Sequence, residues 1–401
     1  MPKPTPPSDA VRVVDALLTR AIQRQASDVH FEPLEDGLIV RFRLDGLLHE
    51  VDRFPAELSL SIIARLKVLA GLLTYRLDIP QEGAFSVQKS ELGSSHSLDI
   101  RISTFPTVRG ERAVARLLYQ ISPVAELEAL GLSHRVVSEL QSAGNQPSGL
   151  ILLTGPSGSG KTTTLYAIAR HILTTTPGRS VVSLEDPVEQ RVAGMTQIQI
   201  TPHGELDYPR AMRSMLRQDV EVLLVGEIRD AQTAHIVIEA ALTGHLILST
   251  LHSGDPGEAI VRLLEMGIAP YQLVGALSVV CSQRLLRRRC MRCRDAGDES
   301  ACTNCAGTGY LGRTACGQIA VVKDTLRDQI ISQAPVCQLR RVIDASCPSL
   351  IEQASDLVAQ GETTAEEARR VLGTVNSDNL PGISTRANNG RAQTGAHHAL
   401  V

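Results

Sequence analysis

The sequence predicts an α/β protein built around a nucleotide-binding domain with a mostly parallel sheet, and two observations support this prediction. Residues 149–164 form an apolar strand pattern, a glycine-rich loop and a helix start. Apolar runs at 150–153, 181–184, 222–225 and 246–248 alternate with segments of helical periodicity. This alternation is typical of right-handed βαβ units, which place their strands in parallel.

The glycine-rich loop is a complete Gly-x-x-x-x-Gly-Lys-Thr motif. Backbone N–H groups in such a loop converge on phosphate oxygens, and the flanking strand and helix argue against a chance glycine turn. Lys161 adds a positive charge there, and the Thr162 hydroxyl is suited to hold Mg²⁺. We expect the phosphates of ATP to be bound by Gly155, Pro156, Ser157, Gly158, Ser159, Gly160, Lys161, Thr162 and Thr163.

Composition limits the class of protein. The chain has 401 residues, 43% of them apolar, which is enough for two or three packed domains. A formal net charge of −3 argues against a dedicated nucleic-acid binder. The sequence has no run of 18 or more apolar residues, the length that would predict a membrane span. We therefore expect membrane association only through a partner. Eight cysteines without an apolar signal segment indicate a reducing, cytoplasmic setting.

Segments rich in turn-forming residues divide the chain into several predicted domains. Before the nucleotide-binding domain, the apolar residues from Val11 to Ile22 have helical spacing. Alternating strand patterns and the hairpin turn Asp45-Gly46 follow, and together they indicate a small α/β domain. The predicted organisation is a flexible leader (1–8), an N-terminal α/β domain (9–122), a linker (123–148), an ATPase core (149–289), a four-cysteine segment (290–313), a C-terminal helical region (314–372) and a disordered tail (373–401).

Polar residues follow three strands of the predicted parallel sheet. Glu227 comes directly after the run 222–225 and is our candidate to orient or activate water, the alternative being a surface residue that caps the next helix. Glu185 and Glu189 are candidates to position metal-bound water, and His252 to sense the γ-phosphate. His245 precedes its strand, which favours a packing role.

Two groups of arginines are candidates for an arginine finger, which stabilises negative charge in the transition state. Each group also fits a solvated basic face. The first group is spaced for one side of a predicted helix, and the second lies in the N-terminal domain. The candidates are Arg210, Arg213 and Arg217 in the first group and Arg101, Arg109 and Arg116 in the second.

Two Cys-x-x-Cys pairs predict a tetrahedral zinc site, with free thiols as the alternative. The eight residues between the pairs are fewer than in a usual zinc-ribbon loop. Six arginines between residues 284 and 294 suit an acidic protein, phospholipid headgroups or nucleic acid, or form a solvated face. The predicted zinc ligands are Cys290, Cys293, Cys302 and Cys305, whereas Cys281, Cys316, Cys337 and Cys347 are expected to be buried apolar residues.

Together these segments resemble the secretion ATPases of type II secretion and type IV pilus assembly, most of all the general secretion pathway protein E group. The N-terminal resemblance lies in 26–33, 41–46 and 99–118. The family's Walker A motif, Asp box, atypical Walker B motif and His box are similar to 155–162, 184–189, 222–229 and 242–252, in family order.

The resemblance implies a hexameric cytoplasmic ATPase in which a PAS-like N-terminal domain and a RecA-like core enclose ATP. It implies that Arg101, Arg116, Arg213 and Arg217 approach the nucleotide or a neighbouring subunit. It also implies peripheral association with the cytoplasmic face of the inner membrane, through platform proteins and a cytoplasmic adaptor. The four-cysteine ribbon favours secretion or pilus extension over retraction.

Several positions differ from the family pattern. Residues 81–84 read Gln-Glu-Gly-Ala instead of Gln-Asp-Gly-Arg, which removes one arginine, and Val220-Glu221 replaces Pro-Asp. Ala315 and Gln318 replace Gly and Glu after the ribbon, and the far N-terminal docking domain of longer members is expected to be absent or vestigial. Two alternatives stay open: a nucleic-acid-translocating RecA-like motor, disfavoured by 3% aromatic residues, and a non-hydrolysing nucleotide-dependent scaffold.

Overall fold

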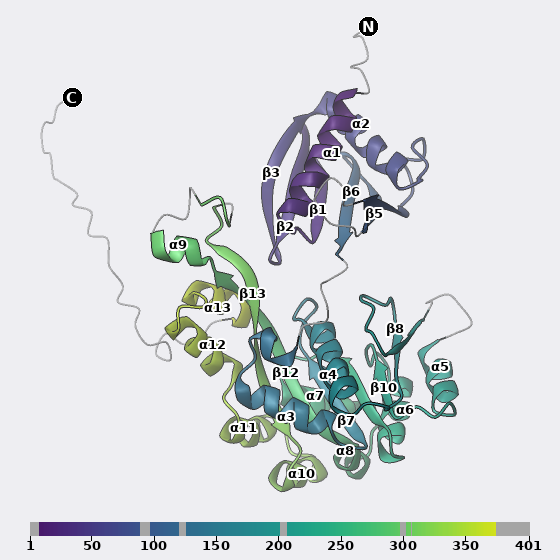
Figure 1. Cartoon of the computed structure of the whole chain (residues 1–401), viewed down its shortest axis with the longest axis vertical. Helices are drawn as coiled ribbons and strands as arrows, with labels where there is room; N and C mark the ends of the chain where they lie inside the picture. Colours follow the sequence, from purple (N-terminus) through teal and green to yellow (C-terminus); the bar gives the residue numbers. More distant parts are fainter. Residues whose placement is uncertain are drawn as a thin grey trace, which may run out of the picture.

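Figure 1 shows the computed structural model of the chain, in which a smaller N-terminal α/β domain adjoins a larger one. The structure describes residues 8–88, 97–119, 126–200, 207–296, 302–305 and 307–373. Nearly all of the predicted leader and tail therefore lies outside the described residues. None of the described helices is long and apolar enough to cross a membrane.

The N-terminal domain is an antiparallel sheet of six strands in the order β3-β2-β1-β6-β5-β4. Two helices pack against the face where alternate apolar side chains are buried. The opposite face carries charged side chains, as the alternating sequence pattern predicts. Its elements are α1 (Ser8–Gln23), β1 (Asp28–Pro33), β2 (Gly37–Leu44), β3 (Leu47–Pro55), α2 (Ala56–Leu69), β4 (Gln81–Gln88), β5 (Ser97–Thr107) and β6 (Gly110–Leu118).

The larger domain contains a sheet of seven strands in the order β13-β12-β7-β11-β10-β8-β9. All neighbours are parallel except β13, which pairs antiparallel with β12. The four strands predicted from apolar runs are confirmed. The strands are β7 (Gly149–Thr154), β8 (Val181–Glu185), β9 (Thr196–Gln199), β10 (Val222–Val225), β11 (Leu246–Leu251), β12 (Leu277–Arg289) and β13 (Tyr310–Val321).

Helices cover both faces of this sheet, and each face has its own apolar core. The helix after the glycine-rich loop, α4, packs on one face, and α6, α7 and α8 pack on the other. This arrangement leaves the carboxyl ends of the central strands open at one edge. The helices are α4 (Lys161–Thr175), α5 (Tyr208–Met215), α6 (Ala231–Leu242), α7 (Pro256–Glu265) and α8 (Pro270–Ala276).

The predicted linker at 123–148 is wrong for its described part. This segment contains η2 (Leu127–Leu130) and α3 (His134–Gly144), and α3 contacts α4, β12 and β13. The apolar residues Val136, Val137 and Leu140 are buried in the core of the larger domain, so this polar-looking segment is an amphipathic helix of that domain.

The C-terminal boundary also differs from the prediction, because β12 and β13 are neighbouring strands of the seven-stranded sheet. The cysteine segment between them is thus an insertion between two strands of one sheet. Helices follow to Leu372, as predicted. They are α9 (Met291–Ala296) within the insertion, and α10 (Asp324–Ile331), α11 (Val336–Ser346), α12 (Leu350–Ala359) and α13 (Ala365–Leu372) after the sheet.

Candidate active site

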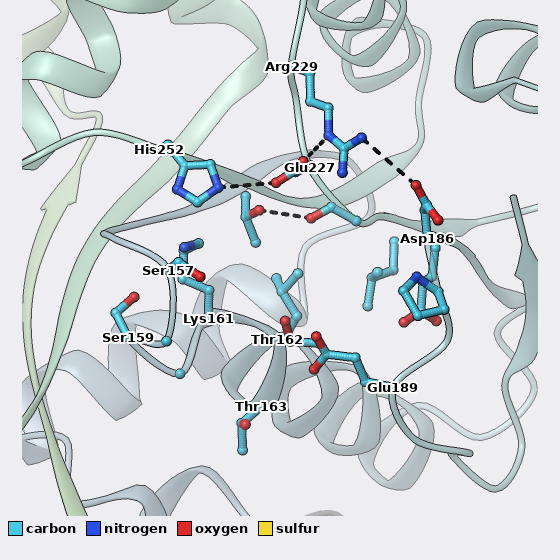
Figure 2. A pocket seen from close by; sticks show the side chains of 18 of the residues that line it. Ser157, Ser159, Lys161, Thr162, Thr163, Asp186, Glu189, Glu227, Arg229 and His252 are labelled. Atoms are coloured by element: carbon cyan, nitrogen blue, oxygen red, sulfur yellow. Dashed lines mark hydrogen bonds and ion pairs between the residues drawn. The ribbon is translucent and has the colours of Figure 1, made fainter. Parts of the chain in front are cut away.

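A cavity of about 350 Å³ lies at the carboxyl ends of β7, β8, β10 and β11 (Figure 2). Its size is within the range of small-molecule sites, and its position is where parallel α/β sheets bind ligands. The glycine-rich loop and the polar strand ends meet here. The lining includes Ser157, Gly158, Ser159, Gly160, Lys161, Thr162, Thr163, Glu185, Glu189, Glu227 and His252.

The glycine-rich loop has backbone angles that explain its glycines. Gly155, Gly158 and Gly160 have φ values of 146°, 74° and 89°, which disfavour residues with a Cβ atom. Lys161 Nζ donates to the carbonyl oxygens of Gly155 at 2.8 Å and Pro156 at 3.0 Å, so the ammonium group lies inside the curve of the loop. Burial lowers the pKa of Lys161 overall, and the negative charge of Glu227 opposes this only in part.

The side chain of Gln283, on β12, supports this loop and was not predicted as a site residue. Its Nε2 donates to the carbonyl oxygen of Ser159 at 2.9 Å, and its Oε1 accepts from Thr164 Oγ1 at 2.8 Å. Arg284 Nη2 donates to the carbonyl of Gly254, beyond the end of β11, at 2.7 Å. In the sequence, these contacts are indicated only by the polar Gln283 and Arg284, which interrupt the apolar residues of β12.

Glu227 lies between His252 and Arg229 at the cavity (Figure 2). Its carboxylate accepts from Arg229 Nε and faces His252 Nε2 at 3.2 Å. Burial raises the pKa of Glu227, but the hydrogen bond and charge of Arg229 and the neighbouring His252 lower it overall. The glutamate is thus held as an anion at the rim of the cavity.

Glu185 and Glu189 have different surroundings. Glu185 is buried, and its carboxylate accepts from Tyr166, Ser183 and Gln197, so its oxygens are already engaged. Glu189 lies beside Thr162 (Figure 2). Desolvation and the Glu185 charge raise the pKa of Glu189, and the Thr162 hydroxyl opposes this rise. Of the two, Glu189 lies next to the predicted Mg²⁺ ligand.

Two histidines flank the neighbouring strand β11. His252 lines the cavity and is half exposed. His245 Nδ1 lies 3.1 Å from the carbonyl oxygen of Ala240, at the end of α6, which fits a packing role.

Four of the six predicted arginines, those that the family resemblance implies, are exposed and are not among the cavity-lining residues: Arg101, Arg116, Arg213 and Arg217. Arg213 and Arg217 lie on α5 and just after it, and their side chains have no hydrogen bond or ion pair within the described part of the chain. Arg101 and Arg116 lie opposite each other on β5 and β6. The pKa of Glu189 is raised by desolvation and by the Glu185 charge, and the charge of Arg116 opposes this rise only in part.

The other predicted arginines also have defined surroundings. Arg109 Nη2 pairs with Glu35 at 3.0 Å on the surface of the N-terminal domain. Arg210 lies on α5, near Asp207, whose carboxylate caps that helix.

The predicted zinc ligands come together. The Sγ atoms of Cys290, Cys293, Cys302 and Cys305 all lie within 4.8 Å of one another. Two of the separations are 3.9 Å and 3.3 Å, and tetrahedral Zn²⁺ with bonds of about 2.3 Å requires sulfurs roughly 3.8 Å apart. The Gly309 amide also donates to Cys305 Sγ at 3.3 Å, as expected for a thiolate. The short spacer therefore permits a geometry that fits zinc.

The remaining cysteines and the basic segment only partly match expectation. Cys281, Cys316 and Cys347 are buried as predicted, but Cys337 is exposed on α11, so its predicted burial is wrong. Within the basic segment, Arg287 binds Glu367 and lies over the Tyr310 ring, and Arg288 binds Glu362. These arginines hold the C-terminal helices against β12.

Comparison with known proteins agrees with this architecture. The sequence profile of the type II/IV secretion system protein family matches residues 7–370. The chain is 39% identical to the type II secretion system protein HxcR of Pseudomonas aeruginosa, covering 90% of this chain and 77% of that protein. It is 37% identical to a putative type II secretion system protein E of Escherichia coli, covering 90% and 76%.

Among solved structures, the ATPase DotB of Legionella pneumophila superposes with a TM-score of 0.70 at 19% identity, covering 92% of this chain and 96% of that one. This similarity confirms the predicted RecA-like P-loop fold of the larger domain. On its sequence and its fold, the chain belongs to the type II/IV secretion system protein family.

Proposed function

We propose that this protein is an ATP-hydrolysing motor that drives pseudopilus or pilus assembly and protein export. The observation that carries the proposal is the cavity in which a complete phosphate-binding loop faces Glu227 and Glu189. A site that only binds nucleotide does not need anionic side chains at the rim that receives the γ-phosphate. The family membership supports the role in secretion.

The proposed chemistry assigns a separate role to each group. The loop amides and Lys161 bind the β- and γ-phosphates once the ammonium group leaves the two loop carbonyls. Glu227 orients the attacking water and accepts its proton, and His252 holds the Glu227 carboxylate toward the γ-phosphate. Thr162 and Glu189 are the side chains that fit Mg²⁺, which would neutralise phosphate charge.

We further propose that Glu185 acts indirectly, because its oxygens are bound by Tyr166, Ser183 and Gln197. It keeps β8 and Glu189 in place. In the proposed homo-hexamer, the exposed Arg101, Arg116, Arg213 and Arg217 supply positive charge to a nucleotide in their own or a neighbouring subunit.

The zinc site is proposed to be structural. Four thiolates fill a tetrahedral coordination shell, so zinc would cross-link the insertion and leave no position for substrate. We place the hexamer in the cytoplasm, on the inner-membrane face, where it binds platform and adaptor proteins. We expect no nucleic-acid partner.

Phosphate release by the purified chain tests the proposal. Wild-type protein should hydrolyse ATP; Lys161→Ala should lose nucleotide binding, and Glu227→Gln should bind ATP but turn over at least about 100-fold more slowly. Glu221→Gln is a matched control, because Glu221 pairs with Arg179 away from the cavity. Equal turnover of Glu227→Gln and wild type would contradict the assignment.

Copurification from detergent-solubilised inner membrane tests the proposed partners. An ATP-locked Glu227→Gln protein should retain secretion or pilus platform proteins. Recovery of DNA-processing proteins, with ATPase activity stimulated by DNA, would instead support a nucleic-acid motor.

A further inference from the structure

The loop between β8 and β9 carries Glu189 and is held by side chains from two neighbouring elements. From α4, Tyr166 Oη accepts from the backbone amide of Glu189 at 3.3 Å. From β9, Gln197 Nε2 donates to the carbonyl oxygen of Gln190 at 2.8 Å, and Gln197 Oε1 accepts from the amide of Val192 at 2.7 Å. Three backbone groups of one loop are therefore bound by two side chains.

The hydroxyl of Tyr166 is oriented by the carboxylate of Glu185, the last residue of β8. An ionised carboxylate only accepts hydrogen bonds, so the hydroxyl proton goes to Glu185 Oε2 and a lone pair is left for the Glu189 amide. Gln197 Nε2 also lies 3.2 Å from Glu185 Oε1. Tyr166 is 2% exposed and Glu185 3%, so water does not compete for these bonds. Both side chains that hold the loop thus bind one buried carboxylate.

The contact with Tyr166 sets the position of the loop along α4. Thr162 and Tyr166 are four residues apart on this helix, so they lie on the same face, one turn apart. Thr162 lines the cavity, and Glu189 lies beside it (Figure 2). The backbone of Glu189 is therefore bound at the second turn of this face, while its side chain lies at the first.

Packing alone does not account for the Tyr166 hydroxyl. The ring lies in the apolar core on this face of the sheet, where a phenylalanine would pack as well without removing a hydroxyl from water. The hydroxyl adds a directed bond to the loop. Buried polar groups whose hydrogen bonds are all made hold a single arrangement of the segments that they join.

We propose that Tyr166 is a positioning residue, which holds the Glu189 carboxylate beside Thr162. Gln197 holds the same loop from the other side. This inference rests on the proposed function, in which Thr162 and Glu189 are the side chains that fit Mg²⁺. Without the hydroxyl, the loop loses a backbone bond to α4, and Glu189 is free to turn away from Thr162.

Titration of the full chain with a fluorescent, non-hydrolysable ATP analogue at increasing Mg²⁺ tests the proposal. Tyr166→Phe should raise the Mg²⁺ concentration for half-maximal binding roughly tenfold, as expected when a group that orients a metal ligand is removed. Affinity in EDTA should stay unchanged, because the loop amides and Lys161 are untouched. Adding Tyr166→Phe to Glu189→Gln should raise the Mg²⁺ requirement no further. Tyr119→Phe is the matched control, since that hydroxyl bonds to the carbonyl oxygen of Ala21 in the N-terminal domain.

The same Mg²⁺ requirement in Tyr166→Phe and wild type would overturn the inference, as would a wild-type affinity that does not depend on Mg²⁺. An equal shift from Tyr166→Phe with and without Glu189→Gln would show a merely structural role. If thermal denaturation shows that Tyr166→Phe does not fold, Gln197→Ala takes its place, and its shift must likewise vanish in the Glu189→Gln background. A folded wild type that binds the analogue with Mg²⁺ but releases no phosphate from ATP would overturn the proposed function, while the binding titration still decides this inference.

Discussion

Replacement of Glu367 by glutamine should destabilise the C-terminal helices strongly at neutral pH. Glu367 lies on α13 with a fully buried side chain, and it accepts hydrogen bonds from Arg287 at 2.8 Å and Arg370 at 2.6 Å. Burial alone raises the pKa of Glu367, but these arginines lower it to about 2 from an ordinary value of 4.5. A pKa difference of about 2.5 corresponds to roughly 3 kcal/mol of stability.

The sign of the pH dependence follows from this lowered pKa. The stabilisation is complete well above the unfolded pKa of about 4.5, and it is lost as the pH falls toward the folded pKa of about 2. Between pH 7 and pH 3 it should therefore fall from roughly 3 to roughly 1.4 kcal/mol. The destabilisation by Glu367→Gln should shrink by the same amount.

Urea unfolding, followed by circular dichroism at both pH values, measures this effect. Glu362→Gln is the control, because Glu362 pairs with Arg288 at an exposed site and should change stability by less than about 0.5 kcal/mol. A Glu367→Gln protein as stable as the control at pH 7 would refute the reasoning. A loss of the same size at both pH values would show that packing, and not charge, holds the helix.

Three further results are expected. Gln283→Ala should weaken ATP binding about tenfold in a fluorescent-nucleotide titration, because the loop loses its bond at Ser159; unchanged affinity would contradict a supporting role. Gly83→Ala should destabilise the N-terminal domain by about 2 kcal/mol in thermal denaturation, since the added Cβ would lie 2.3 Å from the Ala70 carbonyl oxygen. Metal analysis should find one zinc per chain, and none after Cys293→Ser, whereas equal zinc content in both proteins would exclude the four-thiolate site.

The parts of the site that depend on local sequence could be predicted. The glycine-rich loop and the apolar run before it determine their own structure, and the two cysteine pairs carry their ligand spacing. Glu227 was predicted because a strand end fixes the edge of the sheet at which a residue lies. These inferences need only the order of elements along the chain.

Contacts between distant segments could not be predicted in this way. Gln283 meets Ser159 across 124 residues, because β12 pairs with β7 in the sheet. Helix α3 gives no sequence signal of its place in the larger domain, because its polar residues face solvent and the partners of its apolar side are remote in sequence. The short polar strand β9 gives no apolar signal at the sheet edge.

Strand β12 connects two parts of the molecule that differ in chemistry. Its middle carries Gln283, which contacts the phosphate-binding loop, and Cys290 follows directly after its last residue, Arg289. Because β7 and β13 bond to opposite edges of β12, the strand cannot slide along its axis at one end alone. One continuous strand therefore joins the cysteine insertion to the phosphate-binding loop, and its pairing with β13 is irregular between Arg287 and Arg289, next to the insertion.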